Sequence, residues 1–176
     1  YWHLKYEPRK ISFKTAIQKT KKLLENSVKM RIRSDVPIAF SLSGGVDSNV
    51  LAGITKKKLN KNIKCFSIID KDQRYNEQKN IKLSKKFLNC NIKIIRPPKI
   101  NNLKKLEKLI WYHDSPVSTI NFLLHSYLTE KVSKSNFKVL ISGVGADEIF
   151  SGYYDHTLQY LYEIRNLNIF KAEFKH

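Results

Sequence analysis

The stretch Phe40-Ser41-Leu42-Ser43-Gly44-Gly45-Val46-Asp47-Ser48 decides the fold of this chain, because it joins a predicted strand to a predicted helix. The apolar run over residues 36–40 is typical of a buried strand, and residues 48–59 are predicted to be helical. A glycine pair at such a junction permits a tight turn and directs backbone N–H groups and the helix dipole toward an anion. The stretch therefore predicts a phosphate site.

Asp47 narrows the type of phosphate site. A carboxylate repels a phosphate unless a divalent cation lies between them, and Mg²⁺ is typically held by one or two carboxylates together with substrate phosphates. Ser43 and Ser48 add hydroxyl donors to the same loop. We therefore predict a site for magnesium pyrophosphate at this loop.

Other interpretations of the glycine pair are weaker. A Gly-rich turn with Asp47 as a simple N-cap explains a bare glycine pair, but less well the complete Ser-Gly-Gly-x-Asp-Ser string. A Walker A loop needs a lysine that this stretch lacks. A nucleophile elbow has the pattern Gly-x-Ser-x-Gly, so Ser43 is not expected to be a catalytic serine. The string resembles the PP-loop of the N-type ATP pyrophosphatases, which split ATP between its α- and β-phosphates.

Composition limits the class of protein. The 176 residues are 41% hydrophobic, which suffices for one domain with a substantial core. No apolar run is long enough for a transmembrane helix, and nothing at the start resembles a signal peptide, so we expect a cytoplasmic protein without a membrane partner. Cys65 and Cys90 have neither metal-ligand nor disulfide-framework spacing, and we expect both to be small buried residues in a reducing compartment.

The charge of the chain raises the question of a nucleic-acid partner. The formal net charge is +18, and phosphate neutralisation by basic residues dominates nucleic-acid binding. Only six of the 33 basic residues are arginine, however, and the lysines are scattered along predicted helices rather than interleaved with aromatic residues. We therefore do not expect a nucleic-acid partner, although an RNA-modifying enzyme stays an alternative.

Predicted strands and helices alternate along the chain. Strands are predicted over residues 36–40, 63–69, 92–95 and 137–141. Helices are predicted over residues 12–31, 48–59, 76–88, 101–113, 119–134 and 154–174, with a turn over 70–74. Ser12 is the predicted cap of the first helix. Its predicted apolar face consists of Phe13, Ala16, Ile17, Leu23, Leu24 and Val28, and the inward residues of the fourth helix are Leu103, Leu106 and Ile110.

This alternation predicts an α/β fold, a doubly wound parallel sheet with helices on both faces. In such sheets the ligand binds beyond the carboxyl ends of the strands, where the strand order reverses. If the order is 3-2-1-4, the first and fourth strands are neighbours at that reversal. The loop at residues 43–47 would then lie beside the loop at residues 142–148.

The second loop, Ser142-Gly143-Val144-Gly145-Ala146-Asp147-Glu148, supports this arrangement. Gly143 and Gly145 would allow the backbone to approach a nucleotide closely, and Asp147 would supply a second carboxylate to the same magnesium ion. Taken alone, this pattern is also typical of a tight turn followed by helix-capping acids.

Several segments together resemble the synthetase domain of the glutamine-hydrolysing asparagine synthetases. They are the two loops, residues 36–38, 65–68 and 114–117, and the continuation of the second loop through residue 153. Their order and rough spacing agree with that family from about residue 11 to residue 156. Residues 1–11 resemble the linker that follows the family's N-terminal glutaminase domain, and residues 12–176 its synthetase domain, which we expect to be truncated at the C-terminus.

The resemblance implies a two-step reaction that uses ATP and Mg²⁺. A substrate carboxylate, aspartate in the family's namesake, attacks the α-phosphate to give an acyl-adenylate and pyrophosphate. Ammonia, supplied by a glutaminase domain or subunit, then displaces AMP and leaves an amide. A homodimer stays open as the assembly.

The resemblance also implies roles for individual residues. Asp47 and Asp147 would be the catalytic residues that bind the metal. The pyrophosphate side would be held by Ser43, Gly44, Gly45, Asp47 and Ser48. The backbone near Ser41, Ile68 and Gly143 would line the adenosine pocket. Leu42, Val46 and Ser142 would also belong to the nucleotide site, and Asp114 would help to shape the acceptor site.

The chain departs from the family pattern at Val144, where the family usually has an acidic residue associated with the acceptor and nucleophile. Two alternatives therefore stay open: an enzyme with another acceptor, such as a surface sugar or tRNA, and a non-catalytic ATP-binding module. Glu148 is expected to be a helix-start acid or the partner of a basic group. The five histidines show no mutual metal-ligand spacing and are expected to be structural or on the surface.

Overall fold

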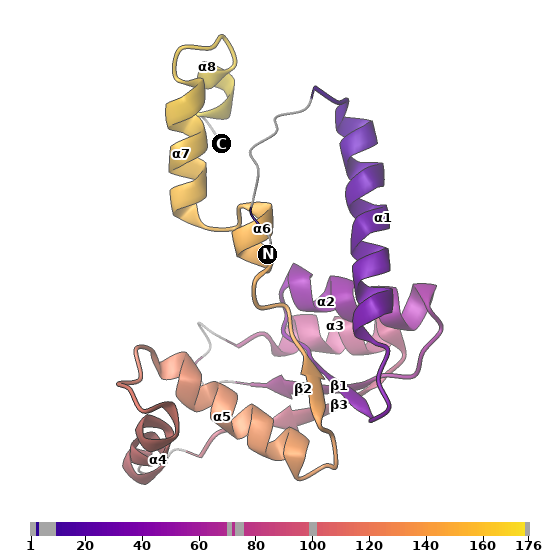
Figure 1. The fold of residues 1–176 in the computed structure, drawn as a ribbon, viewed down its shortest axis with the longest axis vertical. Helices are drawn as coiled ribbons and strands as arrows, with labels where there is room; N and C mark the ends of the chain where they lie inside the picture. The colour runs from indigo at the N-terminus through magenta and orange to yellow at the C-terminus, as the bar shows by residue number, and fades with distance from the viewer. Residues whose placement is uncertain (1–2, 4–9, 70–71, 73–75, 99–101, 175–176) are drawn as a thin grey trace.

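The computed structural model describes residues 3, 10–69, 72, 76–98 and 102–174. Its centre is a parallel sheet of four strands in the order β3-β2-β1-β4 (Figure 1), which confirms the predicted strand order and the doubly wound α/β fold. The strands are β1 Ile38–Ser41, β2 Lys64–Ile68, β3 Asn91–Ile95 and β4 Val139–Ile141.

Helices cover both faces of the sheet. Figure 1 shows α2 (Val46–Gly53) and α3 (Gln78–Leu88) on one face, and α5 (Ile120–Ser133) on the other. The remaining helices are α1 Phe13–Arg31, the π-helix η1 Ile54–Lys58, α4 Leu103–His113, α6 Ala146–Phe150, α7 Tyr154–Ile164 and α8 Phe170–Glu173. None of the helices in the described ranges is both long and apolar enough to span a membrane.

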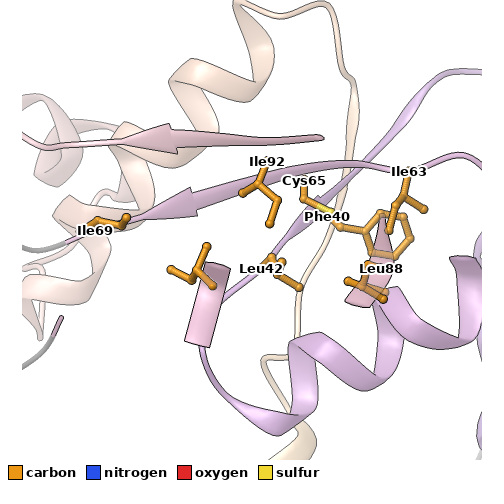
Figure 2. Packing of buried hydrophobic residues seen from close by; sticks show 9 residues of the cluster. Phe40, Leu42, Ile63, Cys65, Ile69, Leu88 and Ile92 are labelled. Atoms are coloured by element: carbon orange, nitrogen blue, oxygen red, sulfur yellow. The ribbon is translucent and has the colours of Figure 1, made fainter. Parts of the chain in front are cut away.

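The strands divide their side chains between two cores, as the alternation of side chains along a strand requires. Phe40, Cys65 and Ile92 lie on one face and pack with α2 and α3 (Figure 2), while Ala39 and Phe66 lie on the other face and pack with α5. Burial of a side chain as large as phenylalanine contributes about 1.5–3 kcal/mol. The two cores therefore fix β1 and β2 in the middle of the molecule.

Helix α1 differs from its predicted packing. Its cap is confirmed, since the Thr15 N–H donates to Ser12 Oγ at 3.2 Å. The predicted apolar face is correct only in part: Val28 is buried and Ala16 and Leu24 are half-buried, whereas Phe13, Ile17 and Leu23 are 82%, 51% and 69% exposed. The reason is that α1 contacts η1 rather than lying along the sheet (Figure 1).

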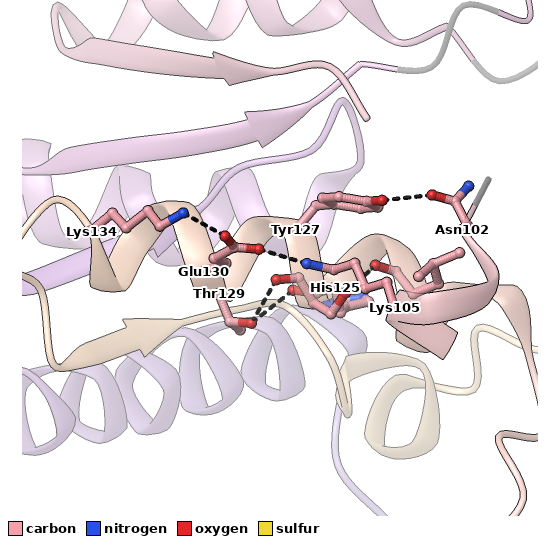
Figure 3. Close-up of polar contacts among 9 residues, drawn as sticks. Asn102, Lys105, His125, Tyr127, Thr129, Glu130 and Lys134 are labelled. Carbon is pink, nitrogen blue, oxygen red and sulfur yellow. Dashed lines mark hydrogen bonds and ion pairs between the residues drawn. The ribbon is translucent and has the colours of Figure 1, made fainter. Parts of the chain in front are cut away.

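Helix α4 contacts α5 through polar and aromatic side chains, and of its three predicted inward residues Leu106 is half-buried whereas Leu103 and Ile110 are exposed. Leu103 and Ile110 are 63% and 41% exposed, whereas the Lys105 ammonium group lies 2.6 Å from Glu130 Oε2 and 4.1 Å from the centre of the Tyr127 ring (Figure 3). The Tyr127 hydroxyl donates to Asn102 Oδ1 at 2.6 Å. Amphipathic periodicity identified the helix but not the face that it uses.

Other boundaries also differ from the sequence prediction. The helix predicted over residues 48–59 begins at Val46 and changes at Ile54 into the π-helix η1, where Thr55 Oγ1 donates to the Leu51 carbonyl at 2.9 Å. The C-terminal helix is divided into α7 and α8, and α6 starts inside the predicted second loop. The turn predicted over 70–74 and the linker at 1–11 lie mostly outside the described residues.

We expect the Glu130→Gln variant to lose stability in a pH-dependent way. The hydrogen bond from Lys105, with a second from Lys134, lowers the pKa of Glu130 from 4.5 to about 2. The stabilisation of the folded state by ionised Glu130 is therefore complete above pH 4.5 and is lost as the pH falls toward 2. Because Glu130 is 45% exposed, the loss at pH 7 should be only about 0.5 kcal/mol. Urea unfolding at pH 7 and at pH 2.5 measures this, with Glu107→Gln as the control; an equal difference at both pH values would contradict it.

The two cysteines should differ in reactivity. Cys65 is buried and Cys90 is half-buried, with their Sγ atoms 3.8 Å apart, so the prediction of two buried residues is correct only for Cys65. The hydrogen bond from Cys65, together with Lys56 and Lys85, lowers the pKa of Cys90 to about 7. Iodoacetamide at pH 7.5 should modify Cys90 in the native protein and Cys65 only after unfolding, and Cys65→Ala should slow the reaction of Cys90. Mass spectrometry that finds equal rates for both native thiols would contradict this.

Candidate functional site

The glycine loop at the carboxyl end of β1 is closed by its own hydroxyl groups. The Ser43 N–H donates to Ser48 Oγ at 3.0 Å, the two serine hydroxyls lie 2.9 Å apart, and the Gly45 N–H donates to Ser43 Oγ at 3.1 Å. Ser48 is only 6% exposed. In this structure the two hydroxyls therefore shape the loop, in addition to any contact that they make with a ligand.

The loop is attached to β2 as well as to β1. Leu42 is fully buried, its N–H donates to the Phe66 carbonyl at 2.9 Å, and its carbonyl accepts a hydrogen bond from the Ser67 hydroxyl. Asn49 closes the other side, where its Nδ2 donates to the Gly45 carbonyl at 2.7 Å. These contacts hold the loop in one shape before any ligand binds.

Helix α2 begins directly after the glycine pair. Gly45 is its N-cap and makes no side-chain cap, and Asp47 lies in the first turn. The alternative in which Asp47 is the N-cap is therefore wrong. An acidic residue in this turn is favoured by the helix dipole, and an anionic ligand at the same end would be favoured for the same reason.

The second loop packs directly on the first. Phe40 of β1 is paired with Ile141 of β4, so both strands end at the same edge of the sheet. A Cβ atom on Gly143 would lie 2.9 Å from both Asp47 Cβ and the Ser48 backbone nitrogen. The predicted meeting of the two loops is confirmed. Gly143 allows the second loop to approach the first loop closely. The sequence had instead predicted that this glycine allows the backbone to approach a nucleotide.

The second glycine of this loop, Gly145, is explained by its backbone conformation. Gly145 has φ +95°, in the left-handed region that favours glycine, and it immediately precedes α6. Asp147 lies in that helix, and its side chain is so close to Gly152 that a Cβ there would be 1.9 Å from Asp147 Oδ1. The Gly152 N–H also donates to the Asp147 carbonyl at 3.0 Å. The turn after α6 thus positions Asp147.

The donor set of the two loops suits Mg²⁺ but not a metal held by protein side chains alone. Within the described ranges, no group of three or more His, Cys, Asp or Glu residues is arranged to hold a metal ion. Asp47 and Asp147 are the two carboxylates predicted for the metal, and Mg²⁺ commonly combines one or two carboxylates with phosphate oxygens and waters. A magnesium ion here would therefore depend on a phosphate ligand for part of its coordination.

A cavity of about 600 Å³ opens between the first loop and α5. Ser41, Leu42, Ser43 and Ile68 line it, and two of these, Ser41 and Ile68, are residues predicted for the adenosine pocket. No motif predicted its other lining residues, which are Glu77, Ile120, Asn121, Leu124, His125 and Leu128. The α5 residues carry no motif, and only the packing of α5 on β2 brings them to the cavity.

Four other predicted residues line a second hollow of about 630 Å³, together with Arg31 of α1: Val46, Asp47, Ser142 and Gly143. Gly143 therefore lines a different hollow from Ser41 and Ile68, although all three were predicted for the adenosine pocket. Asp47 lies at the boundary between the first loop and this hollow.

Glu77 is a further residue of the site that has no sequence signal. The Gly44 N–H donates to Glu77 Oε2 at 2.9 Å across 33 residues of chain. Glu77 precedes α3, at the end of the segment that leaves β2. A parallel sheet brings that segment next to the loop after β1, but nothing in the local sequence indicates the contact.

Two other predicted residues have local roles. Glu148 lies in the first turn of α6, which confirms the alternative of a helix-start acid. The Tyr153 hydroxyl donates to Glu148 Oε1 at 2.8 Å and lowers the pKa of that carboxyl. Asp114 ends α4 in the left-handed conformation, with φ +49°. Its role in an acceptor site stays a prediction.

The sequence model of the family described as asparagine synthase matches residues 19–170. The chain belongs to the asparagine synthase family. This match includes both loops and all four strands, and thereby confirms the resemblance drawn from the motifs.

Two relatives show how the chain compares with other members of this asparagine synthase family. The amidase chyE of Penicillium rubens is 30% identical over 172 residues, which cover 87% of this chain and 25% of the relative. Asparagine synthetase (glutamine-hydrolyzing) 1 of Bacillus subtilis is 30% identical over 155 residues, which cover 87% of this chain and 24% of the relative. The chain thus spans about a quarter of the length of either protein.

A solved structure with the same fold is the U34-tRNA thiolase NcsA of Methanococcus maripaludis. It aligns with a TM-score of 0.55 at 17% identity, over 82% of this chain and 54% of that one. At this identity the likeness concerns the fold alone. It places this asparagine synthase family member in the PP-loop, adenine nucleotide alpha hydrolase-like fold.

The contact between the loops predicts the effect of Gly143→Ala. The new Cβ would press on Asp47 and on the backbone of Ser48 at 2.9 Å, so we expect a loss of about 1–3 kcal/mol in the free energy of unfolding. Gly53→Ala is the matched control, because nothing lies within 4 Å of its Cβ position. The control should be neutral or stabilising by up to about 1 kcal/mol. Urea unfolding tests both, and equal stabilities of the two variants would exclude the predicted contact.

Proposed function

We propose that this chain is the part of an ATP-dependent synthetase that adenylates a substrate carboxylate, releases pyrophosphate and passes the acyl-adenylate to ammonia. The observation that carries the proposal is the packing of the Asp47 loop against the Gly143 loop where β1 and β4 end. Membership in the asparagine synthase family supports it. Each loop alone would be a glycine turn; together they form a two-sided phosphate site.

The orientation of the nucleotide follows from the lining of the spaces around the loop. We place adenosine in the cavity of Ser41 and Ile68, with the polyphosphate over the glycine loop and the start of α2. The opposite side of Gly44 and Gly45 opens under α1 into a hollow of about 910 Å³, where apolar side chains are joined by Lys21, Lys57 and Lys58. We place the nucleotide on the α5 side because Ser41 and Ile68 line the cavity there.

Asp47 and Asp147 would hold Mg²⁺ by their carboxylates. The ion, when bound, neutralises charge on the departing pyrophosphate. The Gly44 N–H and the amides of the first turn of α2 would donate to the same anion, while the Ser43 and Gly45 amides donate to loop hydroxyls and maintain the shape of the loop. A loop whose shape is fixed in advance needs little rearrangement as the charge grows.

The acceptor in this proposal is aspartate, as in the family's namesake. Val144 is 78% exposed and lies between Gly143 and Gly145. The glutamine-hydrolysing asparagine synthetases, which the chain resembles, usually have an acidic residue at this position. Ammonia would come from a glutaminase domain or subunit. Since one relative is named an amidase, other carboxylate acceptors belong in the same assay.

Asp47→Asn in the full-length protein should abolish magnesium-dependent exchange of radiolabelled pyrophosphate into ATP. The amide cannot supply the anionic oxygen that Mg²⁺ prefers, so we expect a fall of about a hundredfold or more. The exchange is measured in the presence of aspartate and of a panel of other carboxylates, and product AMP is quantified in parallel.

Asp35→Asn is the matched control for this assay. It makes the same chemical change at an exposed position just before β1, at the opposite end of that strand from the loop. Full exchange activity in Asp47→Asn would refute the assigned role of Asp47. A wild-type protein that makes AMP and pyrophosphate with any carboxylate would exclude a non-catalytic module.

A further inference from the structure

One amide of the glycine loop already binds a carboxylate of the chain itself. The Gly44 N–H donates to Glu77 Oε2 at 2.9 Å, and a Cβ atom on Gly44 would lie 2.8 Å from Glu77 Cβ. The Glu77 side chain therefore packs against Gly44 near its Cα, in addition to accepting the hydrogen bond. A carboxylate oxygen thus occupies the kind of position that a phosphate oxygen would take.

The neighbouring amides are bound differently. Those of Ser43 and Gly45 donate to neutral hydroxyls within the loop, at 3.0 Å and 3.1 Å. Those bonds define the shape of the loop, and their loss would disrupt that shape. The bond from Gly44 to Glu77 comes from outside the loop, so its acceptor can be exchanged while the loop keeps its shape.

Glu77 is also placed where it would act on a bound anion. Its side chain is exposed, so it can leave Gly44 without opening the core, and it lines the same cavity as Ser41 and Ser43. A carboxylate and a phosphate a few ångströms apart repel each other even where the carboxylate is exposed to water. A divalent cation on the phosphates removes most of that repulsion.

We propose that Glu77 is a specificity-determining residue of the loop: it competes with phosphate for the Gly44 N–H and so selects polyphosphates that carry a divalent cation over bare ones. This inference rests on the proposed function, since it assigns the loop to a polyphosphate. The net charge of +18 attracts polyanions of every kind at long range. The contact between Glu77 and Gly44 would add a local selectivity that the net charge does not provide. Without a local acid, the loop would bind uncomplexed polyphosphate, which cannot react.

Calorimetric titration with inorganic pyrophosphate, in the presence of either Mg²⁺ or EDTA, tests the proposal on the full-length protein. Glu77→Gln keeps an acceptor of similar size and removes the charge. We expect its affinity for pyrophosphate in EDTA to rise about tenfold, as loss of one charge-assisted competing bond implies. The affinity in Mg²⁺ should change by less than about threefold, because the cation already neutralises the ligand.

Glu107→Gln is the control, since it makes the same charge change on α4, and it should leave both affinities as in the wild type. An unchanged ratio of the two affinities in Glu77→Gln, or weaker binding in EDTA, would overturn the assignment of Glu77. A wild-type protein that binds no pyrophosphate even with Mg²⁺ would refute the proposed function. The inference on Glu77 would then be refuted as well, because it rests on that function.

Hydrogen–deuterium exchange provides a second measurement that needs no ligand. The peptide that contains Gly44 should lose protection of about one amide in Glu77→Ala and keep it in Glu107→Gln. Equal protection of that peptide in both variants would show that Glu77 does not hold the Gly44 amide, and would overturn the proposal even if the affinities changed.

Discussion

The pairing of β1 with β4 is the constraint on which the site depends. It joins residues about a hundred positions apart in the chain, with Ile38 opposite Val139 and Phe40 opposite Ile141. Parallel pairing brings the ends of both strands to one edge, and Gly143 then allows the two loops to touch. A shift of one residue in this register would turn the side chains of β4 to the opposite face and separate the loops. The short strand β4 therefore controls the chemistry more than its length suggests.

The loop after β1 is rigid for reasons that are independent of any ligand. Leu42 fixes its entry through burial, through its N–H bond to the Phe66 carbonyl and through the bond that its carbonyl accepts from the Ser67 hydroxyl. The hydroxyl pair of Ser43 and Ser48 fixes its middle. A site that is ordered in advance loses little conformational entropy on binding. The exchangeable contact of Gly44 with Glu77 is the exception, which concentrates the adjustment on binding at one exposed side chain.

Local sequence was sufficient for the order of the strands, the two glycine loops and the position of Asp47, because strand alternation and glycine turns leave signals within a few residues. It was insufficient for Glu77, whose contact with Gly44 depends on the parallel sheet. The cavity residues of α5 were missed for the same reason, since a helix face is assigned only by what it packs against. The prediction for α1 overestimated its packing: an apolar periodicity is present, but half of that face, namely Phe13, Ile17 and Leu23, is exposed.

Val144 occupies a position at which the side chain can change without rebuilding the protein. Its side chain is 78% exposed, whereas Gly143 on one side is restricted by packing and Gly145 on the other by a left-handed backbone. Exposed positions of this kind usually tolerate substitution within about 0.5 kcal/mol. A library of all residue types at 144 can therefore be made on an unchanged scaffold, and differences among its members would reflect the site rather than the stability of the fold.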